Sequence, residues 1–187
     1  MRKLIADVII SLDGYFTSPK NEIDWFDFDE DEWEWSKSIN RRVDAMLLGR
    51  VTYEEFRQFW PTQGPKKMGV DPQFTRRLNG LRKFVFSRSL VDAPWKPATL
   101  VRDDPCKAVA RLKRQPGRDM VVAGSGTLVA ALFQGDLIDE YFVRIRPIIL
   151  GAGRSMFVDA KVRHPLELVS AKTFKSGLIG LHYRSRH

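Results

Sequence analysis

Two short and almost wholly apolar runs in this chain are each followed at once by glycine and then by a helical pattern. The runs cover residues 43–48 and 119–123. A continuous apolar run of this length is typical of a strand that is covered on both faces. Such strands occur in parallel sheets with helices on either side, so this feature predicts an α/β fold.

The remaining patterns place strands and helices in alternation, followed by strands alone. Further strands are predicted at 3–11, 83–86, 99–101 and within 140–150, and helices at 29–40, 52–60, 103–115 and 127–134. Two strand-like segments flank Lys175-Ser176-Gly177 and predict a C-terminal hairpin. Residues 61–80 contain Gly-Pro and Asp-Pro pairs and are expected to be loop, with a short helix at the end of this segment. This order predicts a mixed, mostly parallel sheet between two helical layers, with ligands at the carboxyl ends of its strands.

The length and the bulk composition favour one cytoplasmic domain. A chain of 187 residues fits a single core, so we expect one domain over 1–187. No apolar run is long enough to cross a bilayer, and the start lacks the apolar region of a signal peptide. A single cysteine and three scattered histidines predict no metal site.

The charge of the chain is unevenly distributed. The formal net charge is +8, yet residues 22–35 hold eight acids and no lysine or arginine. The rest of the chain has 31 basic and 15 acidic residues, a net charge of +16. A basic body attracts polyanions, either nucleic acid or a phosphorylated cofactor. No nucleic-acid motif is present, so a cofactor is favoured and no nucleic-acid partner is expected.

The glycine turn at Gly49 offers what a phosphate group needs. A buried strand becomes a helix there, so the first N–H groups and the positive dipole end of that helix are open to an anion. Arg50 adds a guanidinium that can bind a phosphate through two hydrogen bonds. Thr52 is predicted to cap the helix, with Glu55 at the matching capping-box position.

The second turn, from Gly124 to Thr127, repeats this arrangement, and Ser87 and Arg88 close a neighbouring strand at the same edge. Two helix N-termini at one sheet edge suit a ligand with more than one phosphate, such as a dinucleotide. Glycine at such a turn is often there for turn geometry alone, and Arg50 could form a surface ion pair. The occurrence of both turns favours phosphate binding.

The acidic segment contains the candidates for proton transfer. Trp25, Trp33 and Trp35 are expected to pack the first helix on the sheet, with most of the carboxylates in solvent. A carboxylate beside aromatic side chains at a cleft has a raised pKa and can donate a proton or hold ring N–H groups. Glu32 and Asp24 are the candidate catalytic residues.

The motifs LLGRVTYE, KFVFSRSL and GSGTLVAALFQGDLIDEYFVRIRPIILGAG together resemble the dihydrofolate-reductase-like superfamily. The chain is most similar to the reductase domain of the bifunctional riboflavin-biosynthesis deaminase–reductase and its stand-alone relatives. The resemblance covers almost the whole chain. It implies a three-layer αβα fold, a homodimer, and hydride transfer from NADPH to a pyrimidine or pterin-like substrate, as in 5-amino-6-(5-phosphoribosylamino)uracil reductases.

The resemblance also implies which residues contact the cofactor. They are Ala6, Val8, Gly49, Arg50, Thr52, Ser87, Arg88, Gly124, Ser125, Gly126 and Thr127.

The chain departs from the family in two respects: it has no deaminase signature, and residues 61–80 lack the arginine pattern that binds a sugar phosphate. Two alternatives stay open: a true dihydrofolate reductase, in which Glu32 lies nearest to the expected acid, and a non-catalytic NADPH-binding relative.

Overall fold

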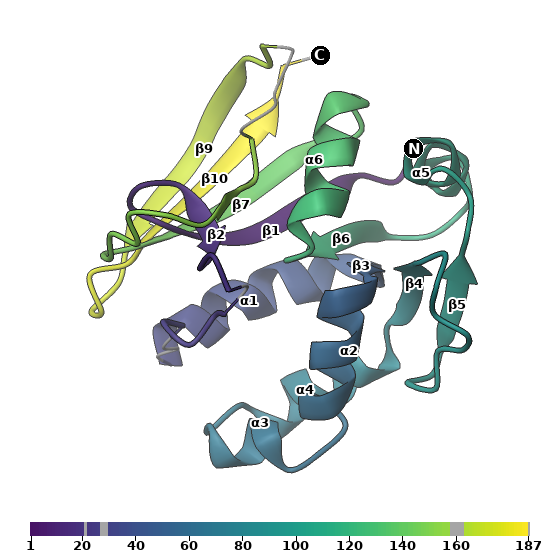
Figure 1. Ribbon diagram of the computed structural model, residues 1–187, viewed down its shortest axis with the longest axis horizontal. Coiled ribbons are helices and arrows are strands. Elements are labelled where there is room, and N and C mark those ends of the chain that lie inside the picture. Colours follow the sequence, from purple (N-terminus) through teal and green to yellow (C-terminus); the bar gives the residue numbers. More distant parts are fainter. Residues whose placement is uncertain (21, 27–29, 158–162, 187) are drawn as a thin grey trace.

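The computed structural model describes residues 1–20, 22–26, 30–157 and 163–186 (Figure 1). Its strands are β1 (Leu4–Ser11), β2 (Tyr15–Thr17), β3 (Val43–Gly49), β4 (Arg82–Phe86), β5 (Ala98–Val101), β6 (Asp119–Ala123), β7 (Glu140–Arg146), β8 (Arg154–Ser155), β9 (Leu166–Thr173) and β10 (Ile179–Ser185). Its helices are α1 (Glu30–Arg42), α2 (Arg50–Phe59), α3 (Gly64–Lys67), α4 (Pro72–Gly80), α5 (Pro105–Lys113) and α6 (Gly126–Gln134). None of the helices in these ranges is long and apolar enough to cross a membrane.

One eight-stranded sheet forms the centre of the fold, in the order β5-β4-β3-β6-β1-β7-β10-β9. The first six strands in this order run parallel, while β10 and β9 are antiparallel to their neighbours. Figure 1 shows β9 and β10 at one side of the sheet and β5 at the other. The predicted mixed sheet with a C-terminal hairpin is therefore confirmed.

Two apolar clusters cover the two faces of this sheet. On one face α5 and α6 pack residues such as Val109 and Val129 against β1, β3 and β6. On the other face α1, α2 and α4 contribute Ile39, Tyr53 and Phe74 to a separate cluster. Each face excludes water through a helical layer, which gives the three-layer αβα architecture. In Figure 1, α6 lies above β1 and β6, and α1 lies below them.

Three local predictions differ from the structure or fall outside it. The helix expected at the end of residues 61–80 is α4, but the segment also holds α3, because Pro65 is a helix-start signal as well as a loop signal. Asp71 caps α4 by accepting hydrogen bonds from the backbone N–H groups of its first turn. Asp29, the predicted start of the first helix, lies outside the described residues, and that helix ends two residues later than expected, at Arg42.

A second, two-stranded ribbon crosses the loops at the carboxyl ends of the central strands. Its strands β2 and β8 pair antiparallel, with Tyr15 opposite Ser155 and Thr17 opposite Arg154. The sequence patterns did not predict it, because three-residue and two-residue strands are too short to show an alternation. The ribbon positions residues of two distant segments at the candidate site.

Candidate functional site

A large cavity of about 830 Å³ opens at the carboxyl ends of β1, β3 and β6. It contains two chemically different parts. The glycine-turn end is formed by Gly49, Arg50, Thr52, Gly124, Ser125, Gly126 and Thr127. The aromatic end is formed by Phe26, Trp33, Phe56, Phe59, Trp60 and Phe74. The cavity has the size of a cofactor or substrate site.

The two glycine turns are hydrogen-bonded to each other. The backbone N–H of Gly49 donates to Ser125 Oγ at 2.9 Å, and the backbone N–H of Ser125 donates to Thr52 Oγ1 at 3.1 Å. Ser125 has a φ of 54° and Gly124 a φ of 53°, a left-handed pair that bends the chain from β6 into α6. The N-termini of α2 and α6 therefore meet at one place, as the sequence predicted.

The helix-capping role predicted for Thr52 was wrong. The helix begins at Arg50 with Gly49 as its N-cap, and within the described residues no side chain caps it. The hydroxyl of Thr52 instead accepts the N–H of Ser125 from the neighbouring turn. The sequence spacing predicted a capping box, but the hydroxyl of Thr52 is taken by the N–H of Ser125, which lies more than seventy residues away in the chain.

Replacing Thr52 by valine is expected to lower the free energy of unfolding by about 1–3 kcal/mol. Valine keeps the shape of the side chain but leaves the N–H of Ser125 without its acceptor. Urea unfolding of the purified variant measures the loss. The control is Thr99→Val at an exposed position of β5, which should stay within about 0.5 kcal/mol of the wild type. Equal values for the two variants would show that this hydrogen bond does not hold the turns together.

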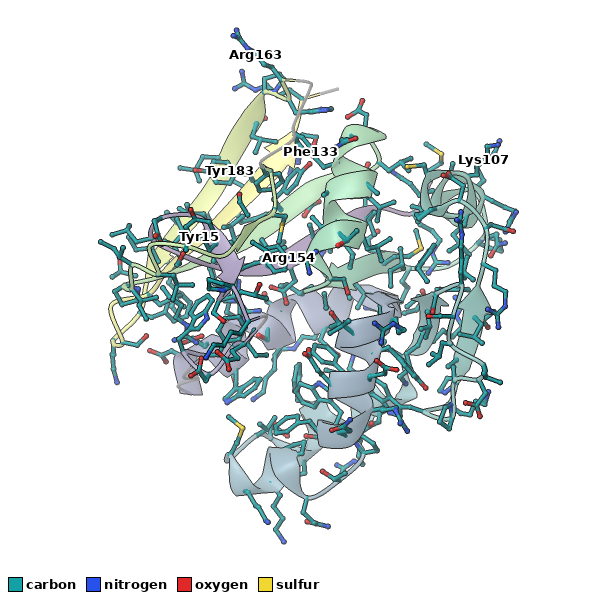
Figure 2. The ribbon with its side chains drawn as sticks, in the orientation of Figure 1. Tyr15, Lys107, Phe133, Arg154, Arg163 and Tyr183 are labelled. Carbon is teal, nitrogen blue, oxygen red and sulfur yellow. The ribbon has the colours of Figure 1, made fainter. Side chains whose placement is uncertain are left out.

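Two arginines lie at the glycine-turn end. Arg50 is 46% exposed and forms an ion pair with Glu54 at 2.7 Å, one turn further along α2. Arg154 comes from β8, donates to Thr127 Oγ1 at 3.1 Å and lies over the ring of Phe16. Figure 2 shows Arg154 beside the first turn of α6. Both guanidinium groups are close to helix N-termini, where an anion is favoured.

The ring of Phe16 packs directly on Gly126. A Cβ atom at position 126 would overlap that ring, so glycine is required there by a close approach rather than by its backbone angles. Phe16 lines the cavity with Thr17, the next residue of β2. The ribbon thus forms one wall of the glycine-turn end.

A buried polar group lies between the two ends of the cavity. Arg144 of β7 pairs with Asp7 of β1 at 2.8 Å and donates to Ser36 Oγ of α1 at 3.2 Å. The side chains of Arg144 and Asp7 are only 6% and 16% exposed. Asn40, one turn after Ser36, also lines the cavity and is 6% exposed. Its Oδ1 has no hydrogen-bond partner among the described residues.

Four predicted cofactor contacts lie away from the cavity. Ala6 and Val8 point into the core beneath α6, because alternate residues of a strand face opposite sides and Asp7 takes the cavity side. Ser87 and Arg88 follow β4 at the same sheet edge but do not line the cavity. The hydroxyl of Ser87 accepts the backbone N–H of Leu90 instead.

Neither candidate for proton transfer lines the cavity. Glu32 is fully buried and forms an ion pair with Arg146 at 2.8 Å, and Asp24 lies in an exposed turn. Among the described residues, the carboxyl groups that line the cavity are those of Asp7 and Glu55. Loss of water raises the pKa of Glu55, and the neighbouring Glu54 carboxylate raises it further.

Comparison with known proteins identifies the family. Residues 2–179 match the model of the RibD C-terminal domain. The chain belongs to this family. Among curated proteins, the chain is similar to the uncharacterized protein YyaP of Bacillus subtilis (strain 168), 29% identical over 97% of this chain and 94% of that protein.

Solved structures show the same RibD C-terminal domain fold. A putative riboflavin biosynthesis protein from Shewanella sp. PV-4 superposes with a TM-score of 0.76 at 20% identity, over 99% of both chains. A diaminohydroxyphosphoribosylaminopyrimidine deaminase/5-amino-6-(5-phosphoribosylamino)uracil reductase from Thermotoga maritima gives a TM-score of 0.69 at 17% identity. That match covers 99% of this chain and 57% of the other.

Proposed function

We propose that this protein is an NADPH-dependent reductase that transfers a hydride to a pyrimidine or pterin-like ring. The observation that carries the proposal is the meeting of two helix N-termini, those of α2 and α6, at one cavity. Membership of the RibD C-terminal domain family supports a reductase. Glu32 is not proposed as the catalytic residue, because it forms an ion pair with Arg146 in the core.

The glycine-turn end fits a dinucleotide. Within the described residues, no side chain caps α2 or α6, so the first N–H groups of both helices are available to phosphate oxygens. The φ of 53° at Gly124 disfavours any side chain at that turn, whereas a Cβ atom at Gly49 would make an ordinary contact of 3.4 Å with Ser125 Oγ. Arg50 and Arg154 would neutralise the phosphate charge.

NADPH supplies the hydride when it is bound, and the protein then has to place the ring and deliver a proton. Ser36 and Asn40 would hold the polar edge of the ring, and the Asp7–Arg144 pair fixes Ser36 in position. Of the two carboxyl groups that line the cavity in the described structure, Glu55 is the better proton donor, because Asp7 is held in an ion pair with Arg144 and the pKa of Glu55 is raised above its ordinary value. Ser87 and Arg88 would contact only a part of the cofactor that extends beyond the cavity.

The test of this function is cofactor binding by Arg50→Ala. Loss of the guanidinium should weaken NADPH binding by about tenfold or more and NADH binding by clearly less, because a charge-assisted bond to the extra phosphate is worth about 1.5–3 kcal/mol. Isothermal titration calorimetry measures both affinities. Arg57→Ala, an exposed change on the same helix, is the control and should leave both unchanged.

Equal losses for NADPH and NADH would contradict Arg50 as the reader of the phosphate. Absence of NADPH binding by the wild type would end the proposal altogether. Binding without any NADPH oxidation across a screen of reducible heterocycles would favour the non-catalytic alternative. The dihydrofolate reductase alternative depended on Glu32, whose pairing with Arg146 leaves it without support from the cavity geometry.

We also propose a cytoplasmic homodimer. The edge strand β9 is exposed along its whole length, including Leu168 and Val169. An exposed apolar edge strand invites pairing with another strand, and a second copy of the same hairpin supplies one.

A further inference from the structure

The aromatic end of the cavity is walled by rings from three helical segments. Trp33 of α1 meets Trp60, which follows α2, with ring centres 6.1 Å apart. Phe74 of α4 lies 5.8 Å from Trp60 and 6.1 Å from Trp33. Phe56 and Met68 continue this wall, and Met68 is 46% exposed at its rim. These rings line this end of the cavity with apolar atoms.

This end of the cavity contains no cation among the described residues. Over the whole cavity, the basic residues that line it in the described part of the chain are Arg50, Arg144 and Arg154. Arg50 and Arg154 belong to the glycine-turn end, and Arg144 lies between the ends with Asp7 as its partner. A phosphate placed among the rings would lose its water without gaining an opposite charge, which is strongly unfavourable.

A polar stripe on α1 borders the rings. Ser36 and Asn40 are four residues apart and lie on the same helix face as Trp33. The carboxamide of Asn40 can both donate and accept, so it matches the N–H and C=O groups along one edge of a pyrimidine or pterin ring. Its buried Oδ1 has no partner in the described structure, so a turn of the carboxamide that brings this oxygen to a ligand N–H would satisfy it.

We infer that the substrate is an unphosphorylated heterocycle with an apolar or aromatic substituent, bound with its polar edge at Asn40 and its substituent among Trp33, Trp60 and Phe74. This inference rests on the proposed reductase function. Such a substrate differs from the phosphoribosyl compounds on which other reductases act. A phosphoribosyl substituent at the aromatic end would need a cation, and this end carries rings instead. Residues 61–80, which carry Met68, are also where the sugar-phosphate arginine pattern is missing.

Calorimetric titration with two matched uracils tests the inference. One ligand is 6-(benzylamino)uracil and the other is 6-(ribitylamino)uracil 5′-phosphate, so the ring is shared and only the substituent changes. The benzyl ligand should bind at least tenfold more tightly to the wild type. Asn40→Leu should weaken binding of the benzyl ligand about tenfold and leave NADPH binding unchanged.

Met68→Arg supplies the missing cation without disturbing the core. This variant should bind the phosphorylated ligand about tenfold more tightly than the wild type does, whereas Gln63→Arg should not, because Gln63 is exposed outside the cavity. Tighter binding of the phosphate ligand by the wild type, or failure of both ligands to bind, would overturn the inference. Each ligand is titrated with and without NADPH. If the wild type does not bind NADPH but still prefers the benzyl ligand, the proposed reductase function is contradicted while the inference about the ligand stands.

Discussion

Replacing Arg146 by methionine is expected to lower the free energy of unfolding by about 3–5 kcal/mol. The side chains of Arg146 and Glu32 are 5% and 0% exposed, and their charged groups lie 2.8 Å apart. Methionine fills a similar volume but leaves the Glu32 carboxylate buried without its principal cation. Burying an uncompensated charge costs far more free energy than replacing both partners by apolar side chains would. Urea unfolding at neutral pH measures the difference.

Arg41→Met is the matched control for this substitution. Arg41 is 72% exposed and lies 4.0 Å from Glu34, so its removal should change stability by less than about 1 kcal/mol. If Arg146→Met unfolds like the control, Glu32 does not depend on this pair. A role for Glu32 in proton transfer would then have to be considered again.

The second large effect is expected at Glu140, where acid should destabilise the protein. Burial by itself would raise the pKa of Glu140, but hydrogen bonds from Arg42, Lys3 and His182 outweigh it and hold the pKa at about 2. Its ordinary value is 4.5. A lowered carboxyl pKa stabilises the folded state above the ordinary value, and this contribution is lost as the pH falls from about 4.5 towards 2.

Glu140→Gln should therefore cost about 3 kcal/mol at neutral pH and flatten the acid side of the stability curve. Urea unfolding at intervals between pH 7 and about 2 gives that curve for each protein. Glu167→Gln, on exposed β9, is expected to follow the wild type throughout. A variant at Glu140 that keeps the full acid dependence would show that other carboxylates produce it.

The order and boundaries of the main elements could be predicted because their signals are local. The apolar run at 43–48 became β3, and the helix predicted at 103–115 became α5, which Asp104 caps by accepting the N–H of Lys107. The meeting of the two glycine turns also followed from sequence, since parallel strands bring their carboxyl ends to one edge.

The polar centre of the site could not be predicted from helical periodicity. Glu32, Ser36 and Asn40 repeat every four residues and look like the solvent face of a helix. They face the sheet instead, because β7 presents Arg144 and Arg146 on the side that α1 covers. The packing of two such surfaces is a property of the assembled layers and not of either segment.

A signal for that centre was nevertheless present in the strands. Asp7 interrupts the apolar run of β1, and two arginines alternate with apolar residues in β7. A charge within a buried strand needs an opposite charge nearby. Since β1 and β7 are neighbours in the sheet, pairing of Asp7 with Arg144 is the simplest way to meet that need.

The contact between Phe16 and Gly126 links what the chain can tolerate at two distant positions. The phenylalanine ring occupies the space that any side chain at 126 would need. Alanine at 126 therefore becomes acceptable only when position 16 carries something smaller. Across related sequences the two positions should covary, with bulk at one excluding bulk at the other, even though neither residue predicts the other from its own surroundings.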